Sequence, residues 1–129
     1  MKKQSTPTRR ELEFLAIIWD LGEATVRDVY ERLRDRERIA QNTVQSILRV
    51  MEEKGLITHR VEGRAFVYRD AYSREQSVKS FVDRVFSGAA HELVASLLKS
   101  ERLSEEDLSA IEGIVKKKRR EERIKKGKK

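Results

Sequence analysis

The stretch IAQNTVQSIL, residues 39–48, is the longest run without a charged residue in a chain that is 40% Asp, Glu, Lys and Arg. Wound as a helix that continues to Lys54, this segment separates two kinds of side chain. One face carries an apolar stripe at the i, i+3, i+4, i+7 spacing: Val44, Ile47, Leu48 and Met51. The opposite face carries, at the same spacing, Asn42, Gln45, Ser46 and Arg49. The segment therefore predicts an amphipathic helix with a polar, almost uncharged outer face.

The outer face of this helix has the chemistry that reads base edges in DNA. Asn and Gln pair bidentately with adenine, Arg pairs with guanine, and Ser pairs with either base. A helix that only faced water would more often carry Glu and Lys at these positions. The alternative is that the Gln, Asn and Ser side chains form an ordinary polar surface.

The positive charge of the chain is concentrated at one end. The 129 residues contain 29 Lys and Arg against 22 Asp and Glu, a net charge of +7. Residues 116–129 (KKKRREERIKKGKK) hold ten of those bases and two of the acids, which leaves residues 1–115 with 19 bases and 20 acids. We expect this basic tail to begin as a helix and to end disordered. It can bind phosphate without sequence preference, or be a solvated terminus.

Four positions match the capping-box signature, in which Ser or Thr is followed three residues later by an acid or Gln. They are Thr8–Glu11, Thr25–Asp28, Ser73–Gln76 and Ser104–Asp107. Apolar residues at helical spacing follow each one, so each predicts the start of a helix. A further apolar stripe over residues 90–98 predicts one more helix.

In residues 56–68 (LITHRVEGRAFVY) the sequence pattern changes from that of a helix to that of a strand. β-branched and aromatic residues surround Glu62-Gly63, which predicts a β-hairpin with its tight turn there, while Gly55 ends the preceding helix. Arg60 and Arg64 flank the tip and can reach phosphate or the minor groove; alternatively, they are solubilising charges on an exposed edge. Two helices, a polar-faced third helix and a hairpin are the order of a winged helix-turn-helix.

The second half of the chain offers three short apolar stripes but little material for a core of its own. A fragment of ~45 residues rarely builds a stable core alone, so we expect residues 73–115 to pack against a second copy of the chain. The alternative is that these helices fold back onto the first half. We favour the dimer because the first half can close its own core around Trp19, Leu33, Leu48 and Phe66.

The composition excludes several classes of function. Without cysteine there is no disulfide, no zinc finger and no thiol nucleophile. No apolar stretch approaches the ~20 residues of a membrane helix, and no apolar segment follows the basic start as in a signal peptide, so we expect a cytoplasmic protein without a membrane partner. His59 and His91 lack neighbouring ligands, and no nucleophile–base pair or phosphate loop is visible. We therefore expect neither an enzyme nor a metal or cofactor site.

Three stretches together resemble the penicillinase-repressor family (BlaI/MecI/CopY type). They are TRRELEFLAIIWDLGEATVRDVYERL (8–33), NTVQSILRVMEEKGLITHRVEGRAFVY (42–68) and the helical half that contains VFSG (85–88). The pattern W-x-x-G-x-x-T-V-R-D-V at 19–29 and the sequence EEKGLI at 52–57 are characteristic together, and the likeness covers about residues 6–115. The resemblance implies a homodimeric winged-helix repressor of a bacterial operon, with operator DNA, a second copy and an antirepressor protease as partners.

The fold class that follows is mainly α with a small β-hairpin wing. We expect a winged helix-turn-helix domain over residues 7–71, a three-helix dimerisation region over 73–115 and the basic tail over 116–129. The expected recognition-helix contacts are Gln41, Asn42, Thr43, Gln45, Ser46 and Arg49. The expected wing and phosphate contacts are Arg60, Arg64, Thr25 and Lys54. The expected dimerisation residues are Val78, Phe81, Val82, Val85, Phe86, Leu93, Leu97, Leu108 and Ile111.

The chain departs from the family pattern at several positions. Gln41 stands where the family often has an aromatic residue or Pro, and Val50 stands where a second basic residue is common. The paired cysteines of copper-responsive members are absent, and Ser96-Leu97 replaces the Asn-Phe bond that is cleaved in β-lactam-responsive members. Two other functions fit parts of the pattern: a winged helix used only for protein interaction, and a non-specific nucleic-acid binder led by the basic tail.

Overall fold

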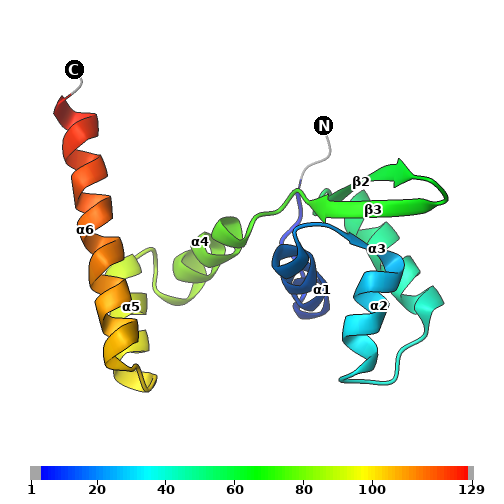
Figure 1. The fold of residues 1–129 in the computed structure, drawn as a ribbon, viewed down its shortest axis with the longest axis horizontal. Helices are drawn as coiled ribbons and strands as arrows, with labels where there is room; N and C mark the ends of the chain where they lie inside the picture. The colour runs from blue at the N-terminus through cyan, green and yellow to red at the C-terminus, as the bar shows by residue number, and fades with distance from the viewer. Residues whose placement is uncertain (1–3, 128–129) are drawn as a thin grey trace. The chain divides into compact units, whose positions relative to one another are not determined.

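The computed structural model describes residues 4–127, which form six helices and three short strands (Figure 1). In chain order the elements are α1 (Arg9–Leu21), β1 (Ala24–Thr25), α2 (Val26–Arg34), α3 (Gln41–Glu53), β2 (Ile57–Glu62), β3 (Ala65–Asp70), α4 (Arg74–Val85), α5 (Ala90–Ser100) and α6 (Glu105–Gly127). The chain divides into two compact units, Met1–Phe81 and Val82–Lys129, and the division falls inside α4. The predicted domain limits at residues 71 and 73 stay a prediction.

All four predicted helix starts are confirmed as reciprocal capping boxes. At α1 the Glu11 amide donates to Thr8 Oγ1 over 3.1 Å, and the Thr8 amide donates to Glu11 Oε1 over 2.9 Å. The same pair of bonds forms between Thr25 and Asp28, between Ser73 and Gln76, and between Ser104 and Asp107. Each box satisfies two amides that the first helical turn leaves unpaired.

The helix that carries the polar face, α3, begins without a side-chain cap and ends in a Schellman motif. Its first flanking residue is Ala40, which makes no side-chain cap bond. At the other end Gly55 has φ +79°, its amide donates to the Glu52 carbonyl, and the Leu56 amide donates to the Met51 carbonyl, both over 3.0 Å. The predicted role of Gly55 is confirmed, and the turn leads directly into the wing.

The wing belongs to a three-stranded antiparallel sheet in the order β1-β3-β2, rather than to an isolated hairpin. The predicted hairpin of β2 and β3 is confirmed, and Ala24 and Thr25 add a third strand by pairing with Tyr68 and Val67. Two residues are too few to show a strand period in sequence. The turn also lies one residue later than predicted, at Gly63-Arg64, where only Gly63 has a positive φ (+64°), as a type II′ turn requires.

The first unit closes its core mainly with residues of the three helices and the base of the wing. The largest fully buried side chains there are Phe14, Leu15, Ile18, Val29, Leu33, Val44, Leu48, Met51, Leu56 and Ile57. Leu33 and Leu48 were predicted as core residues, and Trp19 packs at its edge, donating through Nε1 to the Tyr72 carbonyl over 3.0 Å. The prediction for Phe66 was wrong: its side chain is 46% exposed, because Val67 and Tyr68 take the buried positions of β3.

The second unit has helices but almost no interior of its own. Neither α5 nor α6 contains a buried residue, and Val82 in α4 is the one buried side chain among the described residues of this unit. The helix α6 continues through Gly127, so residues 116–127 of the basic tail are helical. The predicted disordered end falls on residues 128–129, which lie outside the described residues.

Candidate nucleic-acid interface

The two faces of α3 are sorted as the spacing predicts. Val44, Leu48 and Met51 are fully buried, and Ile47 packs against the same core. On the outer face Asn42, Gln45, Ser46 and Arg49 are all exposed. The core thus holds α3 by its apolar stripe and presents the polar stripe to solvent.

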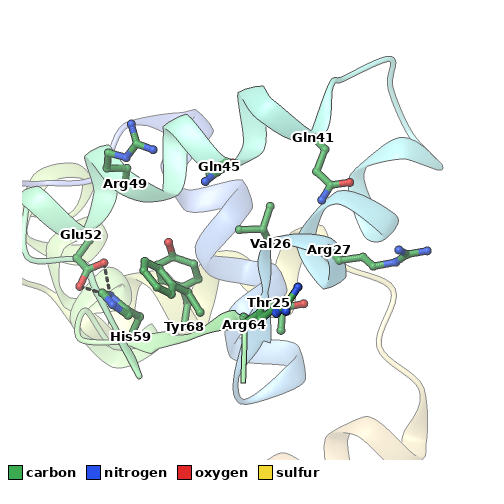
Figure 2. A pocket seen from close by; sticks show the side chains of 12 residues that line it. Thr25, Val26, Arg27, Gln41, Gln45, Arg49, Glu52, His59, Arg64 and Tyr68 are labelled. Carbon is green, nitrogen blue, oxygen red and sulfur yellow. Dashed lines mark hydrogen bonds and ion pairs between the residues drawn. The ribbon is translucent and has the colours of Figure 1, made fainter. Parts of the chain in front are cut away.

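The outer face of α3 forms a ridge between two hollows. Gln41, Gln45 and Arg49 line the larger hollow, of about 650 Å³, on the side of the wing (Figure 2). Ser46 lines a smaller hollow of about 270 Å³ beside the start of α1, together with Val50. The exposed side chains of Asn42 and Thr43 line neither hollow, and Ser46 Oγ donates back to the Asn42 carbonyl over 3.0 Å.

Three elements converge on the larger hollow. The start of α2 contributes Thr25, Val26 and Arg27, α3 contributes one wall, and the wing contributes the other. Figure 2 shows Tyr68 of the wing with its hydroxyl toward α3, the helix that carries Gln45 and Arg49. The wing side is lined by His59, Arg64, Ala65, Phe66 and Tyr68.

A hydrogen bond ties the wing to the end of α3, and a ring stack joins the two strands of the wing. His59 Nδ1 lies 2.7 and 2.8 Å from the two carboxylate oxygens of Glu52. The His59 ring stacks on Phe66 with a centroid distance of 4.0 Å and an interplanar angle of 12°. Cross-strand contacts of this kind stabilise a hairpin. The contact between Glu52 and His59 also fixes the width of the hollow, because one wall is α3 and the other is the wing.

Tyr68 supplies the floor of the hollow on the wing side. Burial raises the pKa of its phenol, the Glu52 carboxylate raises it further, and Arg49 partly opposes both. The phenol therefore keeps its proton at neutral pH and remains available as a hydrogen-bond donor and acceptor.

The basic residues predicted to contact DNA fall into two groups. Arg64, at the tip of the wing, and Arg49 make no ion pair within residues 4–127 and both line the larger hollow. Arg60 does not join them, because successive strand residues point to opposite faces. Its guanidinium instead holds Glu23 at 2.6 and 3.1 Å and Glu62 at 2.7 Å. The hydrogen bond from Arg60 lowers the pKa of Glu23, so this carboxyl stays charged.

Lys54 also forms an ion pair, with Glu11, the one buried acid among the described residues. Its Nζ donates to Glu11 Oε2 over 2.7 Å, and Glu11 is 5% exposed. Burial raises the pKa of Glu11, but the hydrogen bonds from Lys54 and Thr8 outweigh it, so the net pKa is lowered. Lys54 therefore clamps the end of α3 to the start of α1.

Several residues of the hollow were missed by sequence reasoning. Thr25 was predicted as a phosphate contact, but its hydroxyl accepts from the Asp28 amide as a helix cap. Two positions later Arg27 lines the hollow with 78% of its side chain exposed. The capping box was a usable signal for Arg27, because it places that residue in the first turn of α2. His59 and Tyr68 gave no such signal, since their role depends on strand pairing.

The predicted dimerisation residues lie in α4, α5 and α6, except for Phe86, which directly follows α4. Val78, Phe81, Val85 and Leu97 are between 43% and 57% exposed. Phe86, Leu93, Leu108 and Ile111 are half-buried, while Val82 is buried. Most of this apolar surface is thus incompletely covered within a single chain.

Within residues 4–127 no group of three His, Cys, Asp or Glu side chains is arranged to hold a metal ion. None of the helices in that range is long and apolar enough to cross a membrane.

A winged helix with a polar recognition face and an exposed hollow beside it defines the class: a helix-turn-helix protein of the winged type. Comparison with known proteins identifies its family. The family model for the penicillinase repressor matches residues 7–117, so the chain belongs to the penicillinase repressor family. Members of this family are transcriptional regulators and not enzymes.

Individual relatives agree with this assignment. The penicillinase repressor of Bacillus licheniformis is 27% identical over 119 residues, covering 89% of this chain and 93% of the relative. The methicillin resistance regulatory protein MecI of Staphylococcus aureus (strain Mu50) is 23% identical over 112 residues, covering 84% and 91%. A solution structure of the DNA-binding domain of the repressor BlaI matches with a TM-score of 0.53 and 29% identity, over 59% of this chain and 93% of that domain.

Proposed function

We propose that this chain is a sequence-specific repressor that acts in the cytoplasm as a homodimer on a palindromic operator, like the regulators of β-lactam-resistance genes. The observation that carries the proposal is the larger hollow, where Gln45 and Arg49 of α3 lie on the same surface as Arg64 and Arg27. Gln45 and the guanidinium groups of Arg49 and Arg64, which make no ion pair within residues 4–127, therefore face one ligand. Arg27 joins them from a loose 3.8 Å pair with Glu31. The likeness to the solved DNA-binding domain of the repressor BlaI supports the choice of DNA.

Each group has a distinct task in this proposal. The helix α3 enters the major groove, where Gln45 and Arg49 read bases, with Gln41, Asn42, Thr43 and Ser46 beside them. Arg64 on the wing and Arg27 on α2 hold phosphates on the two sides of the groove. Arg60 and Lys54 contribute less, because each must first leave an ion pair with an acid.

Selection of binding sites from random duplexes, followed by a paired substitution, tests the proposal. We expect Gln45→Ala combined with Arg49→Ala to abolish preference for the selected site and to leave weak, salt-sensitive binding. Each lost bidentate pair removes roughly 1–3 kcal/mol of discrimination. Arg34→Ala is the control, since Arg34 pairs with Glu31 at 3.2 Å and lies outside the hollow. Specificity that survives the double change would rule out α3 as the reading element.

Homodimerisation is supported by the uncovered apolar surface of the second unit. Helices with no buried residue gain little from folding alone, so a second copy that covers them supplies the missing burial. A twofold dimer would also match a palindromic site. Sedimentation of the full chain should give a dimer, and Leu97→Asp should give a monomer at the same concentration.

The matched control for the dimer is Val61→Asp. Val61 is 63% exposed on the wing and lies outside the predicted dimerisation residues. We expect this variant to sediment as the native chain does. A monomeric native chain, or a dimer that tolerates Asp at position 97, would contradict the assignment.

The antirepressor protease implied by the family is also a proposal. Ser96-Leu97, the position that matches the cleaved bond, lies within α5 and is exposed. Cleavage there would require α5 to unwind locally, because a protease binds an extended substrate. Coexpression with a family sensor protease, followed by mass analysis of the fragments, tests this route.

A further inference from the structure

The last three turns of α6 lie beyond the part of the chain that matches the family. The family model ends at Lys117, whereas α6 continues to Gly127. Residues 116–127 contain eight Lys and Arg against two acids, while residues 105–115 of the same helix contain four acids and no base. The basic end is therefore a feature of this chain that the winged-helix function does not explain.

The bases are not distributed evenly around this end of the helix. At about 100° per residue, five of them fall within one sector of about 120° that contains no acid. These are Lys116, Arg119, Arg120, Arg123 and Lys126, and all five are exposed. Glu121 and Glu122 lie outside the sector, and Glu122 pairs with Lys118 at 3.2 Å. These five residues form the basic stripe.

We propose that the basic stripe is a second DNA-binding surface, which holds the phosphate backbone of duplex DNA without reading its sequence. Three of the five residues are Arg, whose guanidinium groups bind phosphate in a bidentate manner. The stripe is about 15 Å long at 1.5 Å per residue, which matches roughly four base-pair steps at 3.4 Å each. It supplies the long-range attraction that residues 1–115, with 19 bases and 20 acids, lack.

Duplex DNA fits this stripe better than a lipid surface. A helix that lies in a membrane interface needs an apolar face, and Ile124 is the only large apolar residue among residues 116–127. This proposal rests on the proposed function only in taking duplex DNA as the ligand. It is tested by binding to a duplex of random sequence, so the test gives a result whether or not a specific operator is found.

Two triple variants of the full chain, each with three fewer positive charges, test the stripe. R119Q/R120Q/R123Q removes bases from the stripe, and K117Q/K118Q/K125Q removes bases from the rest of the same segment. Affinity for a random 30-base-pair duplex is measured at several salt concentrations, with circular dichroism to check helix content. We expect the stripe variant to lower the log–log salt slope by about 2.7, which is three contacts at 0.9 each. The control should keep a slope close to native, and neither should change preference for a selected operator.

Other outcomes would overturn the proposal. Equal losses in both variants would show that bulk charge attracts DNA and that the stripe does not. An unchanged slope with weaker self-association would assign the stripe to the acidic start of α6 in a second copy. Tighter binding of a single-stranded RNA or of anionic vesicles than of the duplex would name a different ligand.

Discussion

The helices of the two units have the same spacing of apolar residues, but the two units differ in how far they bury them. In Met1–Phe81 the stripes of three helices meet the base of the wing and bury Phe14, Leu33 and Leu48 completely. In Val82–Lys129 the stripes of α5 and α6 bury none of their residues within the chain. An amphipathic pattern therefore indicates a face that needs covering, and the fold decides whether the chain or another molecule covers it.

Charge differs between the units in a similar way. In the first unit the bases lie close to acids, as in Lys54 with Glu11 and Arg60 with Glu23. In α6 of the second unit four acids and no base lie in residues 105–115, whereas residues 116–127 hold eight bases against two acids. Local pairing neutralises these bases of the first unit, while segregation leaves the basic end of α6 able to attract a polyanion.

The largest expected difference between the units is in their tolerance of a truncated leucine. Leu48→Ala should lower the free energy of unfolding by about 3 kcal/mol, because it opens a cavity in a fully buried site. Leu97→Ala should change it by less than about 1 kcal/mol in dilute protein, because Leu97 is 47% exposed. Urea unfolding followed by circular dichroism measures both. Equal losses at high dilution would show that the second unit has a core of its own.

The local features of this fold could be predicted from sequence, and the long-range ones could not. The capping boxes and the Gly55 turn depend on residues within five positions of one another, and all formed as expected. The strand β1 depends on pairing across more than 40 residues, and Phe66 is exposed because Val67 and Tyr68 take the buried positions of β3. A two-residue strand and a single strand residue carry no periodic signal that reveals such pairing.

The candidate site shows the same limit. The polar stripe of α3 was predictable, because helical spacing alone separates it from the buried stripe. The ion pairs of Lys54 and Arg60 were not, because their partners Glu11 and Glu23 are 43 and 37 residues away. Sequence identifies basic residues, but only the fold shows which of them are already neutralised.

A smaller effect is expected from the clamp between the start of α1 and the end of α3. Lys54→Met should lower the free energy of unfolding by roughly 2 kcal/mol, since it leaves the buried Glu11 carboxylate without its partner. The pKa of Glu11 is lowered in the folded chain from its ordinary value of 4.5. Its contribution to stability is therefore complete above pH 4.5 and is lost as the pH falls through the folded value.

Urea unfolding from pH 7 down to pH 3 tests the sign of this dependence. Glu11→Gln should flatten the acid limb of the stability curve. Asp20→Asn is the control, because the pair of Asp20 with Arg32 is about half exposed on both sides and contributes little. An acid limb that is the same in Glu11→Gln as in the native chain would show that other carboxyls determine acid stability.

The smallest expected effects come from replacing a glycine by alanine, which should lower stability in the first unit and raise it in the second. Gly63→Ala should destabilise the wing by about 1 kcal/mol, because φ at Gly63 is +64°, a conformation that a Cβ disfavours. Gly113→Ala should stabilise α6 by about 0.8 kcal/mol, because this glycine lies inside a helix and a Cβ there meets no atom within 4 Å. Thermal unfolding of the two variants measures both changes. A loss of stability in Gly113→Ala would show that another molecule approaches the α6 backbone at this glycine, and sedimentation of the same variant would show whether that molecule is a second copy of the chain.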